Sequence, residues 1–131
     1  MVRRYDHIDL RVRSLTEARP FYDILLPALG FTKDISSGPW LEYQTGEGEA
    51  AADFFGIIES SQHVANENRI AFWAPTFAEV DRLAAVVRAA GGRNIEGPGY
   101  EAPYYYAVFF EDPSGNRLEV CHRTKTDPEG S

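Results

Sequence analysis

The sequence predicts an α+β protein built from two βαβββ modules, and three observations support this prediction. The stretch from residue 6 to residue 30 recurs in pattern 62 positions later, from residue 68 to residue 92. In both stretches an alternating strand precedes a Ser/Thr-x-x-Glu helix start, and a glycine able to adopt a left-handed conformation ends the helix. Short β-prone segments separated by turn residues follow each helix. Because the strand, the helix start and the helix stop all recur at the same offset of 62 positions, they indicate an internal duplication.

The first copy is expected to span residues 5–60. Its strand at 5–13 alternates, with Ile8, Leu10 and Val12 on the face opposite His7. The helix at 15–29 is predicted to bury one stripe of side chains, formed by Phe21, Ile24, Leu25 and Leu29. Strands are predicted at 31–35, 40–45 and 52–59, and the polar segment 60–68 is the expected linker.

The second copy is expected to span residues 68–123, followed by a tail at 124–131. Its predicted elements are a strand at 69–74, a helix at 77–90, and strands at 93–96, 104–111 and 117–122, with a turn-rich segment at 97–103. One helix cannot cover a whole sheet. We therefore expect a single domain in which the modules form a curved mixed-sheet cup, with helices on the outer face and a small-molecule ligand on the concave face.

Composition narrows the class of partner. Twenty acidic residues against thirteen basic ones give a net charge of −7, which opposes nucleic acid or an anionic membrane as partner. The single cysteine, Cys121, excludes an internal disulfide and fits a reducing compartment. No run of residues approaches the roughly 20 apolar residues of a membrane span. We expect a soluble cytoplasmic protein.

Three segments together identify a family: YDHIDLRV, RIAFWAPTFAEVDRLAAVVRAAGG and YYAVFFEDPSGNRLEVCHR. The chain resembles the vicinal oxygen chelate superfamily of glyoxalases, extradiol dioxygenases and bleomycin or fosfomycin resistance proteins. The resemblance covers about residues 5–123, and the closing D-P-x-G-N-x-x-E pattern is its most specific part. It implies two βαβββ modules, a homodimer, and a divalent metal held by the first and fourth strands of each module.

The resemblance places two candidate catalytic residues. His7 falls at the ligand position of the first strand, and Glu119 matches the closing glutamate of the second module. Alternation agrees in both cases, because each lies on the face opposite its apolar neighbours. The alternative roles are a half-exposed histidine at a strand start and a structural salt bridge for the glutamate.

The remaining ligand positions argue against a complete metal site. Arg69 occupies the position equivalent to His7, and a guanidinium has no lone pair to offer a metal. Arg69 is instead expected to pair with Glu119 or to bind anionic oxygens of a ligand. In the fourth strand of the first module, a gapped match selects Asp53 and the ungapped offset selects Ile57. We predict His7, Glu119 and Asp53 as the metal set, for Mn, Fe, Ni or Zn. His63 and His122 are expected to lie on the surface.

Aromatic residues are expected to complete the ligand site. Trp73 shares the face of Arg69, and Tyr105 is one of the alternate tyrosines at 104–106. With Arg69 they are the predicted substrate-binding residues. The sequence favours an enzyme, a lyase, isomerase or dioxygenase that stabilises an oxyanion or enediolate. The alternative is a metal-free protein that binds a small molecule or drug, as bleomycin resistance proteins do.

Overall fold

The order of helices and strands repeats once along the chain. A computed structural model describes residues 5–46 and 53–124, and the chain divides into two units, residues 1–64 and 65–131. Each unit has the order strand, helix, three strands, so the predicted α+β fold of two βαβββ modules is confirmed. The boundary between the units lies in the predicted linker.

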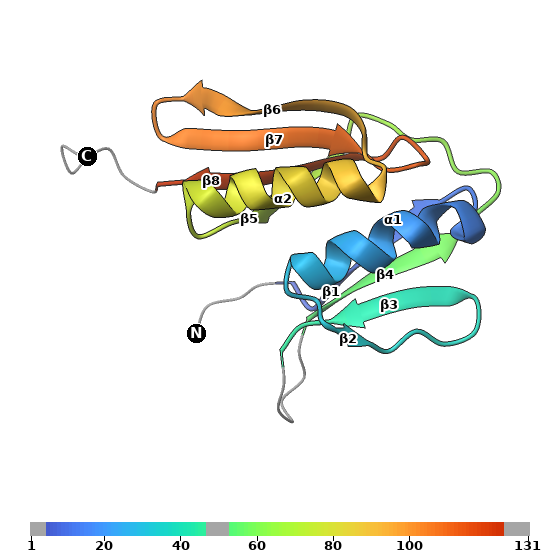
Figure 1. Ribbon diagram of the computed structural model, residues 1–131. Helices are drawn as coiled ribbons and strands as arrows, with labels where there is room; N and C mark the ends of the chain where they lie inside the picture. Colours follow the sequence, from blue (N-terminus) through green and yellow to red (C-terminus); the bar gives the residue numbers. More distant parts are fainter. Residues whose placement is uncertain (1–4, 47–52, 125–131) are drawn as a thin grey trace. The chain divides into compact units, whose positions relative to one another are not determined.

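Unit one carries a four-stranded mixed sheet with one helix on one face (Figure 1). Its elements are β1 (His7–Val12), α1 (Leu15–Ala28), β2 (Lys33–Asp34), β3 (Trp40–Gln44) and β4 (Phe54–Glu59). The strand order is β1-β4-β3-β2, with β1 parallel to β4 and the other pairs antiparallel. The parallel pair is possible because α1 crosses one face of the sheet and brings the chain to β2, at the edge opposite β1.

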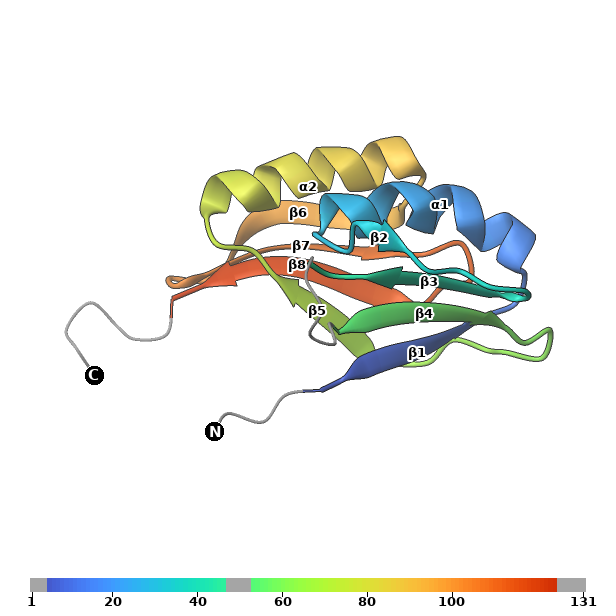
Figure 2. The same ribbon diagram turned by 90° about the horizontal axis from the view of Figure 1, so that it is seen from below.

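Unit two repeats this topology. Its elements are β5 (Arg69–Trp73), α2 (Phe77–Ala90), β6 (Arg93–Ala102), β7 (Tyr105–Glu111) and β8 (Arg117–Arg123). The strand order is β5-β8-β7-β6, and β5 runs parallel to β8. In Figure 2 the helix of each unit lies on one face of that unit's sheet, and neither helix of the described residues covers the opposite face. We call the uncovered side the open face of each unit.

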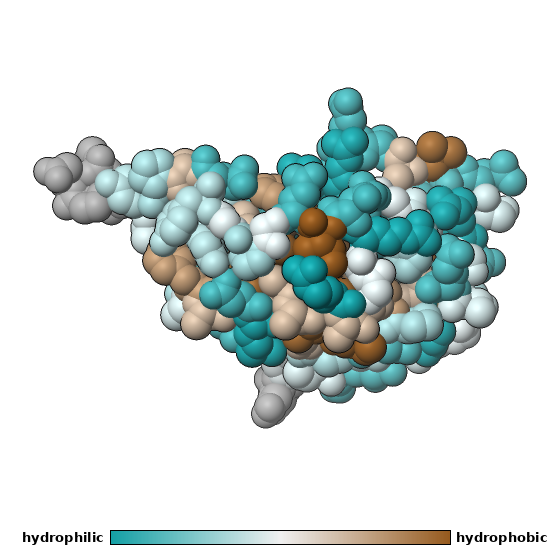
Figure 3. All heavy atoms as spheres, turned by 45° about the horizontal axis from the view of Figure 1, so that its top comes forward, coloured by the Kyte–Doolittle hydropathy of each residue, from teal (hydrophilic) through white to brown (hydrophobic). Residues whose placement is uncertain are grey.

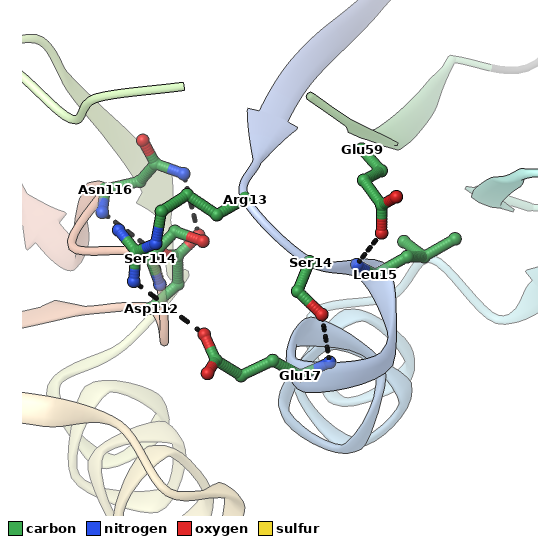
Figure 4. Close-up of polar contacts among 8 residues, drawn as sticks. All are labelled: Arg13, Ser14, Leu15, Glu17, Glu59, Asp112, Ser114 and Asn116. Atoms are coloured by element: carbon green, nitrogen blue, oxygen red, sulfur yellow. Dashed lines mark hydrogen bonds and ion pairs between the residues drawn. The ribbon is translucent and has the colours of Figure 1, made fainter. Parts of the chain in front are cut away.

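Both helices begin at the predicted caps. The Ser14 hydroxyl accepts a hydrogen bond from the backbone N–H of Glu17 at 3.1 Å (Figure 4), and the Thr76 hydroxyl does the same for Glu79 at 3.1 Å. Each cap satisfies a donor that the first helical turn leaves unpaired, a contribution of about 1 kcal/mol. The α1 start has a further acceptor, because the Glu59 carboxylate receives the N–H of Leu15 at 2.8 Å. The caps therefore fix the helix starts at equivalent residues in the two units.

The helix ends differ by one residue. In α2 the left-handed cap is Gly91, with φ of 93°, whereas in α1 the helix ends through Leu29 and the left-handed residue is Gly30, with φ of 104°. Gly92, which the repeat aligns with Gly30, is not the left-handed residue. The glycine stop is confirmed in both units, and only its position relative to the last helical residue differs.

The core of each unit lies between its helix and its sheet. The fully buried side chains in unit one include Phe21, Tyr22, Leu25, Leu26, Phe55 and Ile57, and those in unit two include Val80, Val87, Val108, Leu118 and Val120. Burying each such side chain contributes about 1.5–3 kcal/mol. The predicted α1 stripe is wrong at Ile24, which is 46% exposed. Tyr22 and Leu26, which flank it, take the buried positions instead.

The turn predicted at residues 97–103 is also wrong, because β6 continues through Gly97 and Pro98 to Ala102. β6 is the edge strand of its sheet, so Pro98 is tolerated without breaking the sheet. Register shifts between β6 and β7 accommodate the irregular backbone. Gly97 has φ of 94°, and a Cβ there would lie 2.7 Å from the carbonyl oxygen of Ala107, so no other residue fits.

In the view of Figure 3, hydrophilic residues predominate and hydrophobic ones are scattered among them. Neither helix in the described part of the chain has the length and apolar character needed to cross a membrane. The exposed large side chains include Tyr5, Trp40, Trp73 and Tyr100.

Candidate functional site

The open face of unit two carries the predicted residue Glu119. Glu119 on β8 lies opposite Ala71 of β5 and opposite Phe109 of β7. Its chain neighbours Leu118 and Val120 are fully buried toward α2, so the glutamate projects to the other side of the sheet. Glu119 is nevertheless only 4% exposed. A buried carboxylate needs polar partners, because the loss of water is costly.

Two hydroxyl- or thiol-bearing side chains supply those partners. The Tyr105 hydroxyl donates a short hydrogen bond to Oε2 of Glu119, and the Cys121 thiol is also hydrogen-bonded to Glu119. Burial, and then the hydrogen bond to Glu119, raise the pKa of Tyr105 well above its ordinary value. Burial, followed by the charge of Glu119, raises the pKa of Cys121. Both groups therefore remain protonated donors at neutral pH, and Cys121 is not an activated nucleophile.

A cavity of about 610 Å³ opens beside this cluster, lined by Ala71, Trp73, Cys121, Arg123 and Thr124. Trp73 is 67% exposed and offers a flat aromatic wall. The Arg123 guanidinium lies 5.6 Å from the centre of the Tyr105 ring. Arg123 thus places a positive charge next to the hydroxyl that holds Glu119.

Arg69 also lies on this face, but it does not pair with Glu119. Its guanidinium lies 4.8 Å from the centre of the Phe109 ring, and it lines a second cavity of about 270 Å³ with Arg117, Glu96 and Glu111. Among the residues that the structure describes in unit two, no ion pair involves Arg69. The expected Arg69–Glu119 pair is therefore absent from this unit, because the aromatic ring of Phe109 receives the guanidinium instead.

The open face of unit one carries His7. The His7 ring stacks on Phe54 with centroids 4.5 Å apart, and its Nδ1 lies 2.8 Å from a carboxylate oxygen of Asp6. The Nε2 atom is 3.7 Å from the Asp9 carboxylate. The hydrogen bond to Asp6 raises the pKa of His7, and the negative charge of Asp9 adds to the effect.

Asp53 lies just before β4 and accepts a hydrogen bond from the Thr45 hydroxyl at 2.6 Å. Its alternate neighbours Phe55 and Ile57 are buried in the core of unit one, and Asp53 does not line the cavity that contains His7. The hydrogen-bonded register gives a different equivalence. Gly56 lies opposite Asp9 as Glu119 lies opposite Ala71, so Gly56 is the unit-one counterpart of Glu119.

The two other histidines have distinct surroundings. His122 faces α2, where its ring packs on Phe77 at 4.9 Å and its Nδ1 lies 2.9 Å from the carbonyl oxygen of Ala74. It is half-buried rather than on the surface, because the alternation that brings Glu119 to the open face turns His122 toward the helix. His63 is half-buried in the linker.

Sequence reasoning did not select Asp9 and Glu42, which line a cavity of about 350 Å³ with His7. The signal for Asp9 was present, since it alternates with His7 on the same strand. Glu42 could not be found this way, because its position opposite Gly56 depends on the register between β3 and β4.

The described residues do not gather three His, Cys, Asp or Glu side chains in an arrangement that could hold a metal. On unit two, Glu119 and the protonated Cys121 share their face with Arg69, Arg117 and Arg123, whose charges oppose a divalent cation. This donor set does not fit a metal. The predicted ligand set of His7, Glu119 and Asp53 draws on both units and stays a prediction.

Comparison with known proteins establishes the family. The model of the Glyoxalase/Bleomycin resistance protein/Dioxygenase superfamily matches residues 4–120, so the chain belongs to this superfamily. A glyoxalase/bleomycin resistance protein from Albidiferax ferrireducens is 27% identical, with a TM-score of 0.74, and the match covers 92% of this chain and 98% of that one. No curated protein matches the chain.

Other solved structures share the fold at lower identity. The fosfomycin resistance protein FosX from Listeria monocytogenes, solved with Mn(II) and sulfate, is 21% identical with a TM-score of 0.67, and the match covers 95% of this chain and 94% of FosX. A glyoxalase/bleomycin resistance protein/dioxygenase family enzyme from Burkholderia phytofirmans is 20% identical with a TM-score of 0.70, covering 91% and 98% of the two chains.

Proposed function

We propose that this protein is a lyase or isomerase of the superfamily that acts on a small molecule at the open face of unit two, with Glu119 as the acid–base group. The observation that carries the proposal is a buried carboxylate held by a tyrosine hydroxyl beside a cavity. Burial raises the pKa of the neighbouring Tyr105 and Cys121, and titratable groups with shifted pKa values gather at functional sites. The cavity size is in the ordinary range for a small-molecule ligand.

The reaction that suits these groups is proton transfer at a carbon next to a carbonyl group. Glu119 takes the proton as the C–H bond breaks, and the electron pair of that bond moves to the carbonyl oxygen to form an enolate or enediolate. Arg123 lines the cavity and supplies a positive charge for the developing oxyanion. The enolate oxygen then takes this proton back from Glu119, which gives the enol isomer of the substrate and regenerates the enzyme.

The residues that line the cavity of unit two indicate the class of substrate. Trp73 offers a flat surface for an aromatic or planar group, and Arg123 suits a carboxylate or another anionic oxygen. Arg69 and Tyr105 remain predicted substrate-binding residues, with Tyr105 also orienting Glu119. An arylpyruvate, which combines an aromatic ring, a carboxylate and an acidic C–H group, has all of these features.

The test is exchange of the acidic protons of phenylpyruvate and hydroxypyruvate with solvent, followed by proton NMR in D₂O. We expect Glu119→Gln to reduce the protein-catalysed exchange about 100-fold or more, in line with the loss of a positioned acid–base group. Arg117→Gln, on the same face but in a different cavity, is the matched control. Exchange that persists in Glu119→Gln would show that another group, such as His7, is the base.

The second candidate function is metal-free binding of a small molecule, and the exposed Trp73 beside Arg123 favours it specifically. If the protein only binds the molecule, adding phenylpyruvate should shift the Trp73 indole resonance. The acidic protons of phenylpyruvate should then exchange no faster than without the protein. Glu119→Gln would then leave binding and exchange unchanged. The dioxygenase activity and the homodimer that the sequence suggests stay predictions.

A further inference from the structure

The open face of unit one has a cavity whose lining residues differ in kind from those of the cavity beside Glu119 in unit two. Its volume is about 350 Å³, at the small end for ligand pockets. The lining residues are His7, Asp9, Arg11, Trp40, Glu42, Phe54, Gly56 and Ile58, all from β1, β3 and β4.

The register arranges these residues in rows across three strands. The middle row is Asp9, Gly56 and Glu42, lying opposite one another on β1, β4 and β3. Gly56 has no side chain, so the two carboxylates flank an open floor. A Cβ on Gly56 would lie 3.1 Å from Oδ1 of Asp9 and 3.7 Å from Cγ of Glu42, which shows that both side chains lean over the glycine.

Aromatic rings stand on both sides of this acidic row. The row containing Phe54 also holds His7, stacked on it, and the row containing Ile58 holds Trp40, which is 48% exposed. Trp40 and Phe54 therefore border the carboxylates along the strand direction. Ring faces and carboxylates both attract cations, and neither group is a hydrogen-bond donor.

The charged side chains that line the cavity are the carboxylates of Asp9 and Glu42 and the basic groups of His7 and Arg11. The Glu42 carboxylate is half-buried and takes part in none of the described ion pairs, and Asp9 has His7 as its partner at 3.7 Å. Arg11 lies in the Trp40 row, at the end of the cavity. The two carboxylates therefore share the middle row, while the two basic residues lie in the rows on either side of it.

We propose that this cavity binds an organic ammonium ion, with the amine between Asp9 and Glu42 and an aromatic or alkyl body against Trp40 and Phe54. A primary ammonium has three N–H donors, enough to serve both carboxylates. The proposal uses no residue of unit two, so it stands whether or not the proposed acid–base function is correct.

The two tryptophans of the chain make the test selective, because Trp40 lines this cavity and Trp73 lines the cavity of unit two. Phenethylamine is titrated into the full chain while both indole N–H resonances are followed by NMR, with Trp40→Phe and Trp73→Phe used to assign them. We expect phenethylamine to move the Trp40 resonance and leave that of Trp73 in place. Neutral 2-phenylethanol should bind at least tenfold more weakly.

Variants separate charge from shape. Asp9→Asn and Glu42→Gln change charge at nearly constant size, and each should weaken phenethylamine about fivefold or more, as expected for a lost hydrogen bond to a charged group. Gly56→Ala should weaken it by filling the floor. Gly99→Ala, where a Cβ would meet nothing within 4 Å, is the matched control and should bind as the parent does.

Three outcomes would overturn the proposal. Equal binding of amine and alcohol would show that the cavity is merely apolar. Unchanged affinity in both Asp9→Asn and Glu42→Gln would show that the carboxylates do not contact the amine. Displacement of phenethylamine by equimolar Zn²⁺ or Mn²⁺ would show that the cavity prefers a metal ion to an organic ammonium ion.

Discussion

The contact between Glu119 and Tyr105 allows a sharp test of whether the buried carboxylate is kept for stability or for chemistry. Glu119 is 4% exposed, and its oxygen accepts from the Tyr105 hydroxyl. A hydrogen bond to a charged group contributes about 1.5–3 kcal/mol. Because Cys121 remains as a second donor, we expect Tyr105→Phe to lower the free energy of unfolding by about 2 kcal/mol. For a chain of this size, that corresponds to a fall in Tm of about 6–10 °C.

Glu119→Gln should behave in the opposite way. The amide keeps a carbonyl acceptor for Tyr105 but removes a buried charge that has no ion-pair partner among the described residues of unit two. Replacing an uncompensated buried charge by a neutral group is often neutral or stabilising, so we expect a change between zero and about 1 kcal/mol in favour of the folded state. The Tyr105 pKa should also fall, since Glu119 is one of the causes that raise it.

The double variant completes the cycle. In the Glu119→Gln background the tyrosine hydroxyl makes only a neutral hydrogen bond, so Tyr105→Phe should cost about 1 kcal/mol and the coupling energy should be about 1 kcal/mol. Urea unfolding of the four proteins measures it. If Tyr105→Phe costs less than about 0.5 kcal/mol in both backgrounds, the hydroxyl does not hold a charged Glu119, and the reasoning is refuted.

Two further predictions concern other residues. Arg69→His should bind Zn²⁺, Ni²⁺ or Co²⁺ at least tenfold more tightly than the parent in calorimetry, because it removes a positive charge and places a histidine at the position equivalent to His7. Arg123→His, on the same face, is the control. An equal gain in affinity there would contradict the assignment of Arg69. Burial, followed by the hydrogen bond donated to Asp23 at 2.9 Å, raises the pKa of Tyr43 to about 12. The raised pKa means that the stability contributed by Tyr43 is fully present below about pH 10 and is lost as pH rises toward about 12. Unfolding followed between those values should show a smaller loss of stability in Tyr43→Phe than in the parent.

Local signals were sufficient to predict the helices. The predicted α2 range, residues 77–90, is that of the structure, and α1 starts at the predicted residue 15. Both starts depend on a side-chain oxygen and an N–H three residues away, which the sequence shows directly. Ile24 was misassigned because a helix has more apolar residues than its sheet can cover, and only packing decides which remain exposed.

Structural features that depend on the pairing between strands could not be predicted from the sequence. The alternation of single strands correctly placed His7 and Glu119 opposite their apolar neighbours. The sequence could not show which residues of β4 and β8 are equivalent, because the number of positions that separates equivalent residues of the two modules changes along the chain. Residue 9 corresponds to residue 71, whereas residue 56 corresponds to residue 119. The second unit therefore has one more residue between these strands, and an ungapped comparison of the closing strands fails.

This change of offset bears on how the two units have diverged. On the first strands the equivalent residues are His7 and Arg69, and on the closing strands they are Gly56 and Glu119. Unit one thus keeps the imidazole and lacks the carboxylate, while unit two keeps the carboxylate and has a guanidinium in place of the imidazole. The surroundings of these positions differ as well, because Asp9 leans over Gly56 in unit one and the Phe109 ring receives Arg69 in unit two. The two proposals made above follow this difference: a cation at the acidic row of unit one, and oxyanion chemistry at the arginine-bordered carboxylate of unit two.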